Sequence, residues 1–233
     1  MVGSGPADLG SNPRETIYAR LDDCTSEDDC MKDATEVFDH WAIIGKDEGM
    51  EKGHAAAVTE MLEFIAENRT DPFNAIDIGC GNGWVVRKLS DFANCTHAIG
   101  IDGAEAMIAK AKTIDAKGDY RLVVLPDYQP DTKVDVIHSM EFIYYLHDPA
   151  QMLNNIHNHW LNSGGLVIFG IDFYAEHKRS HGWPGLLDVH MTLHSEEEWL
   201  ALWENAGFVD ITSWRANPNT DFPGTLVISG RKV

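Results

Sequence analysis

Short apolar runs and amphipathic stretches alternate along most of this chain. Apolar runs bounded by glycine, proline or aspartate indicate buried strands, whereas apolar positions that recur every three or four residues indicate helices facing a core. The sequence predicts seven strands, over residues 73–77, 97–102, 120–127, 134–139, 164–172, 208–214 and 225–231. Helical segments separate the first three strands, and another lies between the fourth and the fifth; a turn rich in proline and asparagine separates the last two. The pattern indicates an α/β core that ends in an antiparallel pair.

Two helices are predicted before the first strand. The first begins after Met31, and its apolar face is formed by Ala34, Val37, Phe38, Trp41 and Ala42. The second has an apolar face that runs through Val58 to Ile65 and ends near Asn68.

The segment between these helices, 45–54, contains three glycines and alternating charges, so we expect a loop. Binding residues concentrate on loops that a rigid scaffold positions, which makes Glu48, Met50 and His54 pocket candidates.

The composition fits one domain with an acidic surface. With 233 residues, 44% of them hydrophobic, the chain can bury one sizeable core. Residues 1–29 show no sustained period and are rich in Gly, Ser, Pro and Asp, so we expect a flexible tail before a single domain over 30–233. The formal net charge of -19 disfavours a nucleic-acid partner, because that binding depends on Lys and Arg neutralising phosphates.

A glycine-rich turn follows the first strand. It reads Asp-Ile-Gly-Cys-Gly-Asn-Gly over 77–83, and a helical pattern begins directly after it. Glycine permits positive φ, and the missing Cβ lets a ligand lie against the backbone beside a helix N-terminus. A dinucleotide fingerprint requires Gly or Ala at position 84, where this chain has Trp84. The turn therefore favours S-adenosylmethionine over a nicotinamide or flavin dinucleotide.

This motif resembles the first motif of class I S-adenosylmethionine-dependent methyltransferases, in the small-molecule branch. The resemblance extends from about Asn74 to the C-terminus. It implies a doubly wound, seven-stranded, mostly parallel sheet of the Rossmann-like methyltransferase fold, whose last two strands form a hairpin. It also implies an N-terminal helical cap, which we expect over 30–68. Phe38 and Trp41 either face the cofactor from this cap or pack on the sheet. A lid inserted after the fifth strand, over 173–194, is expected to cover the substrate.

The cofactor residues are predicted at the carboxyl ends of the strands, where open α/β sheets bind ligands. Asp102 ends the second strand, where a carboxylate can accept both ribose hydroxyls, although an Asp there can also cap the next helix. In the family an acid after the third strand often takes the adenine amino group, which points to Asp127 and to Tyr128 beside it. The expected cofactor set is Trp41, Asp77, Gly79, Cys80, Gly81, Gly83, Asp102, Gly103, Asp127, Tyr128 and Met140.

The acceptor residues are predicted after the fourth and fifth strands. Glu141 in a pocket would have a raised pKa and could take a proton or pair with a cation; a solvent-facing loop residue is the alternative. The expected catalytic residues are Glu141, His181 and Tyr145, and the expected substrate residues are Tyr144, Asp172, Tyr174 and His190. Carboxylates and aromatic faces favour a neutral or cationic small acceptor with an amine, hydroxyl or thiol group.

Other features limit the possible functions further. No disulfide framework is indicated by the spacing of Cys24, Cys30, Cys80 and Cys95. The lid histidines match no zinc pattern, so no metal site is predicted. No apolar run approaches the roughly 20 residues of a membrane helix, and the N-terminus lacks a secretion signal. We therefore expect a cytoplasmic protein without a membrane partner; the sequence indicates no oligomeric state.

The sequence thus predicts an S-adenosylmethionine-dependent methyltransferase that moves the methyl group to a small molecule by in-line displacement and releases S-adenosylhomocysteine. Two other classes remain. One is a non-catalytic S-adenosylmethionine-binding or regulatory protein on the same fold. The other is a nucleotide-dependent oxidoreductase, which Trp84 disfavours.

Overall fold

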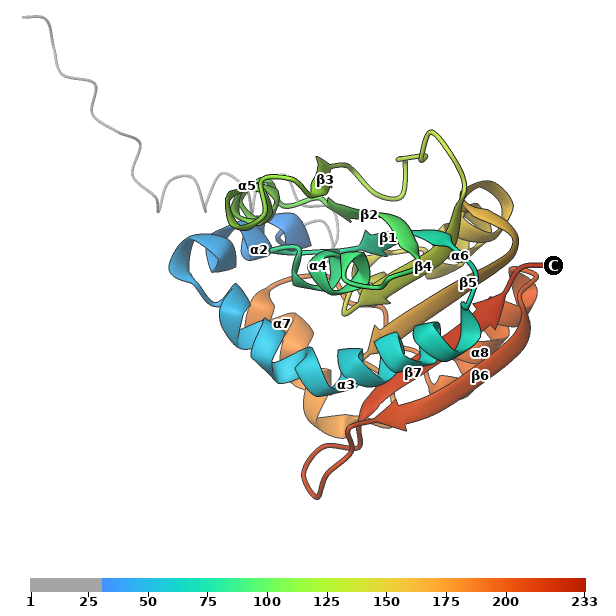
Figure 1. The fold of residues 1–233 in the computed structure, drawn as a ribbon. Coiled ribbons are helices and arrows are strands. Elements are labelled where there is room, and N and C mark those ends of the chain that lie inside the picture. Colours follow the sequence, from blue (N-terminus) through green and yellow to red (C-terminus); the bar gives the residue numbers. More distant parts are fainter. Residues whose placement is uncertain (1–30) are drawn as a thin grey trace, which may run out of the picture.

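A seven-stranded sheet forms the centre of the computed structural model, which describes residues 31–233 (Figure 1). The strand order is β3-β2-β1-β4-β5-β7-β6. Strands β1 to β5 are mutually parallel, whereas β7 is antiparallel to both of its neighbours, β5 and β6. The strands are β1 (Phe73–Ile78), β2 (Cys95–Asp102), β3 (Asp119–Leu122), β4 (Val134–Met140), β5 (Leu161–Ile171), β6 (Val209–Ala216) and β7 (Thr225–Arg231). The predicted seven-stranded, mostly parallel sheet with a final hairpin is confirmed.

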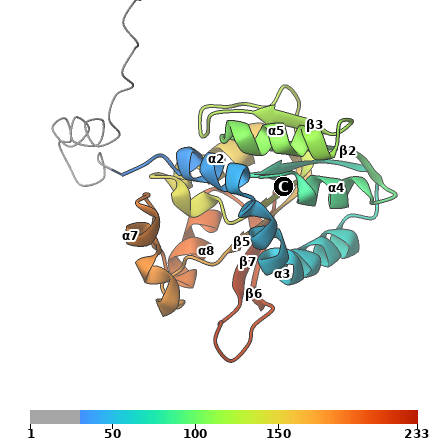
Figure 2. The ribbon, with the colours of Figure 1, turned by 90° about the vertical axis from the view of Figure 1, so that its left-hand side faces the viewer.

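Helices cover both faces of the sheet (Figure 2). One face packs against α3 (Asp47–Asn68), α4 (Trp84–Ser90) and α5 (Glu105–Ile114), and the other against α6 (Pro149–Asn155), the π-helical turn η3 (Ile156–Trp160) and α8 (Glu196–Asn205). Alternate residues of each strand supply the two cores, so Ala75 packs toward α3 and α4 while Ile76 packs toward α6 and α8. Burial on both faces explains why these strands read as nearly continuous apolar runs.

Side chains cap the starts of two helices. The Asp148 side chain accepts a hydrogen bond from Gln151 N at 2.9 Å and caps α6. Ser195 and Glu198 form a complete capping box at the start of α8.

The predicted loop over 45–54 is wrong. Helix α2 (Ala34–Ile44) ends at Gly45, and α3 starts at Asp47 and continues for 22 residues. Asp47 is only 5% exposed and accepts hydrogen bonds from Asn82 Nδ2 at 3.0 Å and Lys110 Nζ at 2.8 Å. These tertiary contacts fix the first turn of α3 and outweigh the low helix propensity of its glycines.

The third strand is shorter than predicted. It ends at Leu122 rather than at Asp127, because Val123 N bonds to Asp102 O and the chain then turns through a cis Leu125–Pro126 bond. Asp127 therefore lies beyond the sheet on an exposed turn. Strand β5 differs in the other direction, since it starts at Leu161 rather than at Gly164.

The segment after β5 is irregular, as expected. It contains a 3-10 turn, η4 (Lys178–Gly182), and a short helix, α7 (Trp183–Leu187). It reaches the start of the described chain, where Lys32 N bonds to Asp188 O at 2.8 Å (Figure 2). Among residues 31–233, no helix combines the length and the apolar character needed to cross a membrane.

Gly83 is expected to tolerate no side chain. Its φ is +78°, and a Cβ would lie 2.3 Å from Tyr120 Cε1. We expect Gly83→Ala to lower the free energy of unfolding by about 2–4 kcal/mol through backbone strain and overpacking. Gly53 is the matched control, because a Cβ there meets nothing within 4 Å. Gly53→Ala, inside α3, should stabilise by about 0.5–1 kcal/mol. Urea unfolding measures both, and equal stability of Gly83→Ala and wild type would contradict the close contact.

Candidate functional site

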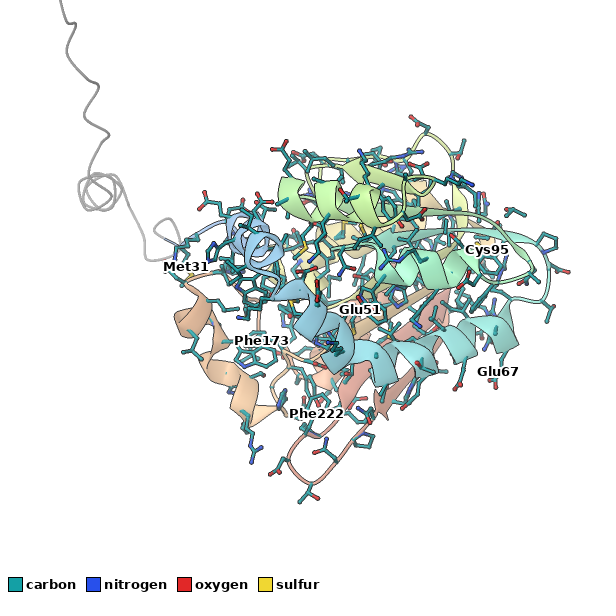
Figure 3. All side chains as sticks on the ribbon, turned by 60° about the vertical axis from the view of Figure 1, so that its left-hand side comes forward. Met31, Glu51, Glu67, Cys95, Phe173 and Phe222 are labelled. Carbon is teal, nitrogen blue, oxygen red and sulfur yellow. The ribbon has the colours of Figure 1, made fainter. Side chains whose placement is uncertain are left out.

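A cavity of about 510 Å³ opens at the carboxyl ends of β1, β2 and β4. This is the switch point of the sheet, where β1 lies between β2 and β4. The N-terminal parts of α2 and α3 form the outer wall of the cavity. Figure 3 shows side chains of α2, α3 and the segment after β5 at this end of the molecule, with Met31 labelled just before α2, Glu51 on α3 and Phe173 just after β5.

The glycine turn and Asp102 form one end of the cavity. Gly79, Gly81 and Gly83 have φ values of 68°, 53° and 78°, which only glycine adopts without strain. Asp102 Oδ2 accepts a hydrogen bond from Gly81 N at 2.8 Å, and its Oδ1 accepts one from Ala104 N at 2.8 Å. Burial raises the pKa of Asp102 to about 6, although these two backbone N–H groups oppose the shift. Asp102 thus connects the turn to the start of α5.

Asp77 is held beneath the turn. Its Oδ1 lies 2.7 Å from His138 Nδ1, and both side chains are buried. Burial raises the pKa of Asp77, while the charge of His138 and its hydrogen bond lower it. The pair fixes the end of β1 against β4.

Glu141 forms the opposite wall. It directly follows β4 and has a φ of +60°, which is rare for a residue with a side chain. Its Oε2 accepts a hydrogen bond from the Tyr144 hydroxyl at 2.6 Å, and its Oε1 accepts one from Asp172 N. Burial, and then the nearby Asp172, raise the pKa of Glu141 well above its usual value. Strained backbone of this kind clusters at functional sites.

Aromatic side chains connect α2 to this wall. Phe38 lines the cavity and meets Tyr145 of η2 (Ile143–Tyr145) edge to face, with ring centroids 5.3 Å apart. Trp41 packs on the other side of Phe38, also at 5.3 Å, and Lys46 Nζ lies over its ring at 3.5 Å. Trp41 therefore supports Phe38 and does not line the cavity.

The structure brings ten of the predicted site residues to the cavity wall. These are Asp77, Gly79, Cys80, Gly81, Asp102, Gly103, Met140, Glu141, Tyr145 and His190. The other eight lie off the wall, namely Trp41, Gly83, Asp127, Tyr128, Tyr144, Asp172, Tyr174 and His181.

Most of the residues that do not line the cavity are held elsewhere by their packing, their hydrogen bonds or their place in the chain. Tyr128 packs edge to face on Trp160 at 5.7 Å. Tyr174 is buried and donates to Gly224 O at 2.7 Å, while His181 Nε2 lies 3.1 Å from Ala175 O. Asp127 lies beyond the early end of β3, so Val123 to Pro126 line the cavity in its place. Tyr144 and Asp172 stand directly behind Glu141.

Several wall residues were missed by sequence reasoning. Asn82 links the glycine turn to Asp47, and His147 stacks on His190 with ring centroids 3.8 Å apart. Two of the pocket candidates from the sequence, Met50 and His54, do line the cavity, but they lie on helix α3 rather than on a loop, and Glu48 does not line it. Only the spacing of three or four residues between Glu51 or Met50 and His54 could have indicated one helical face.

The residues present fit S-adenosylmethionine. Each oxygen of Asp102 accepts one backbone N–H and keeps a second lone pair for a ribose hydroxyl. A Cβ at Gly81 would stand in the cavity wall, so its absence leaves the backbone open to a ligand. Glu141 and His190 line the same cavity as these groups.

Residues 50–213 match the family model described as a methyltransferase domain. The chain belongs to this methyltransferase domain family. The predicted methyltransferase class is thereby confirmed, and solved structures of S-adenosylmethionine-dependent methyltransferases share the fold of this chain.

Curated relatives match the central part of the chain. A malonyl-[acyl-carrier protein] O-methyltransferase of Bacillus anthracis is 32% identical over 40% of this chain and 35% of its own length. A tRNA U34 carboxymethyltransferase of Campylobacter jejuni is 35% identical over 52% of this chain and 45% of its own length. The chain thus spans about half or less of these relatives.

Solved structures match more of the chain. The complex between the Haloferax volcanii Trm112 methyltransferase activator and a methyltransferase contains a chain that is 26% identical, with a TM-score of 0.74. The match covers 86% of this chain and 98% of that chain. A SAM-dependent methyltransferase of Thermotoga maritima matches with a TM-score of 0.63 at 19% identity, over 85% and 99% of the two chains, which is a likeness of fold.

Proposed function

We propose that this methyltransferase acts on a small molecule held between the glycine turn and Glu141. This proposal rests on one observation: a single cavity is lined by Asp102 and also by Glu141, Tyr145 and His190. In-line displacement needs the methyl donor and the acceptor in one enclosed space, so a cavity with two such ends suits the reaction.

Asp102 is proposed to bind the ribose, and Gly79, Cys80 and Gly81 are proposed to carry the methionine part of the cofactor. The adenine would lie between Gly103 and the Val123–Pro126 segment, which replaces Asp127 at the wall. The ribose-binding role is supported by the orientation of the Asp102 carboxylate. Backbone N–H groups of Gly81 and Ala104 each donate to one of its two oxygens.

Glu141 is proposed to activate the acceptor. Its carboxylate lines the cavity and is held by Tyr144 and Asp172 N, so its orientation is set before the acceptor arrives. The cofactor supplies a methyl group on a sulfonium. With the cofactor bound, the acceptor atom would form a bond to the methyl carbon as the carbon–sulfur bond breaks, the electron pair would stay on sulfur, and the Glu141 carboxylate would take the acceptor proton.

An acceptor of neutral or positive charge is proposed. The wall around Glu141 is formed by Tyr145, Phe142 and His190, whose aromatic faces suit such a molecule. The net charge of -19 repels a polyanion, although one curated relative is named for a tRNA reaction. We keep the segment over 173–194 as the proposed lid and 30–68 as the proposed cap of one domain over 30–233. Two backbone hydrogen bonds support this proposal. Thr192 N donates to Tyr144 O and ties the lid to η2, beyond the cavity end of β4, and Lys32 N donates to Asp188 O and ties the lid to the cap.

A methyl-transfer screen tests the acceptor. Amines, alcohols, thiols, carboxylic acids and short RNA are offered with labelled S-adenosylmethionine, and release of S-adenosylhomocysteine is measured. We expect turnover with neutral or cationic small molecules. Turnover confined to RNA or to carboxylate or phosphate compounds would overturn the proposed acceptor class.

A protein partner is also proposed, at the free edge of β3. Leu122 of β3 and Ile114 on the neighbouring α5 are both 51% exposed there. An edge strand with exposed apolar residues offers both hydrogen bonds and contact area for strand addition. The Haloferax volcanii relative is in complex with the Trm112 activator, and we propose that an activator of this kind binds this edge.

Co-purification with a Trm112-type activator tests this partner. We expect Leu122→Glu, at an exposed position of β3 that does not line the cavity, to abolish the complex and leave thermal stability unchanged. Leu186→Glu, on α7 and 80% exposed, is the matched control and should retain it. Equal retention by both variants would exclude the β3 edge.

A further inference from the structure

Three side chains with metal-ligand atoms converge at the Glu141 end of the cavity. They come from α3 (His54), the end of β4 (Glu141) and the end of β5 (Asp172). One ligand atom from each lies within 4.8 Å of the other two, and His54 Nε2 is 3.6 Å from Asp172 Oδ2. The residues are far apart in the sequence, and the fold brings them together.

Neither of the two carboxylates forms an ion pair with a Lys or Arg of residues 31–233. Asp172 is 6% exposed, and its Oδ1 makes no hydrogen bond of acceptable geometry, although the Thr225 hydroxyl is close enough to lower its pKa. Among the ion pairs of residues 31–233, neither Glu141 nor Asp172 meets a Lys or Arg; Asp172 meets only His54. Burying carboxylates without a compensating charge is unfavourable. The site therefore suits a bound cation.

We propose that His54, Glu141 and Asp172 bind a divalent metal ion. Two ligand atoms that each lie about 2.0–2.2 Å from one ion stand roughly 3–4 Å apart, which fits the 3.6 Å between His54 and Asp172. An ammonium group with hydrogen bonds of about 2.8–2.9 Å would hold its acceptors about 4.6 Å apart. Asp172 also lies off the cavity wall, directly behind Glu141. Mixed imidazole and carboxylate ligands favour Mn²⁺, Fe²⁺ or Zn²⁺.

Neighbouring groups hold the ligands in place. The Tyr144 hydroxyl and Asp172 N orient the Glu141 carboxylate, and the strained φ of Glu141 turns it from the strand direction. His177 Nδ1 lies 2.7 Å from Asp172 O and fixes the backbone behind that ligand. Such surrounding hydrogen bonds are a regular feature of metal sites.

A metal ion bound by Glu141 would explain how this residue activates the acceptor. This inference rests on the proposed function and deepens it. His54 and Glu141 line the cavity, so open positions of the ion face the acceptor. A hydroxyl or thiol bound there loses its proton to solvent more easily, and the resulting anion forms the bond to the methyl carbon as the carbon–sulfur bond breaks. Glu141 then acts as a ligand.

Calorimetry with MnCl₂ and ZnCl₂, after treatment with a chelator, tests the site. We expect one equivalent to bind wild type and at least tenfold weaker binding to His54→Ala and to Asp172→Asn. His159→Ala is the matched control, because His159 is exposed and outside the cluster, and it should bind like wild type. Binding of S-adenosylhomocysteine by each variant shows that it is folded, and His54→Gln serves if Asp172→Asn does not fold.

The outcomes separate this inference from the proposed function. No metal binding up to millimolar ion, or equal binding by wild type and His54→Ala, overturns the metal site. If S-adenosylhomocysteine still binds and chelated enzyme still methylates an acceptor, the proposed function stands without the ion. If metal binds but no small molecule is methylated, the proposed acceptor class fails instead.

Discussion

Asp102→Ala is expected to weaken the binding of S-adenosylhomocysteine by a hundredfold or more. The substitution removes the acceptors proposed for two ribose hydroxyls, and each hydrogen bond to a charged group contributes about 1.5–3 kcal/mol. It also leaves Gly81 N and Ala104 N without their acceptor, so the free energy of unfolding should fall by about 1–3 kcal/mol. Calorimetry and urea unfolding measure the two effects separately.

A control and the pH dependence sharpen this test. Asp91→Ala, at an exposed position, should bind the cofactor product normally. Burial raises the pKa of Asp102 to about 6, with Asp77 and Asp39 adding to the shift, so the carboxyl group is protonated as the pH falls through 6. Only the ionised form accepts both hydroxyls, so wild-type affinity should fall about tenfold from pH 7 to about pH 5. Asp102→Ala should lose that dependence. An unchanged affinity would assign Asp102 to holding the turn alone.

Glu141→Gln is expected to lower kcat by about a hundredfold or more, the scale of losing a group that handles the acceptor proton. The amide is nearly the same size, but it carries no charge and is a poor metal ligand. Because Glu141 lies at the acceptor end, binding of S-adenosylhomocysteine should change little. Steady-state kinetics with the best acceptor of the screen measures the effect.

Glu67→Gln is the matched control for charge removal, since Glu67 is exposed on α3 far from the cavity wall. A Glu141→Gln enzyme with wild-type kcat would remove Glu141 from the reaction. A large loss of cofactor binding by the same variant would instead place the cofactor, rather than the acceptor, beside Glu141.

Local patterns were sufficient to predict the sheet and the cofactor turn. The strands are buried on both faces, so their apolar runs are visible in the sequence, and glycines at 79, 81 and 83 are required by their positive φ. Asp102 could be predicted because its position at the end of a strand determines what it faces.

The features that the sequence did not predict depend mainly on contacts between segments that are far apart in the chain. The N-terminal turn of α3 depends on Asn82 and Lys110 holding Asp47, which no local pattern encodes. Asp127 was misplaced because β3 ends early, at Leu122. The cluster of His54 with Glu141 and Asp172 joins three elements, and one of its members lies on the helix that was mistaken for a loop.

A crystal structure with S-adenosylhomocysteine tests the central claim most directly. The account predicts both ribose hydroxyls at Asp102, the amino-acid part against Gly79 to Gly81, and the sulfur facing the compartment walled by Glu141, Tyr145 and His190. A ligand with its ribose away from Asp102, or with its sulfur facing away from Glu141, would contradict it.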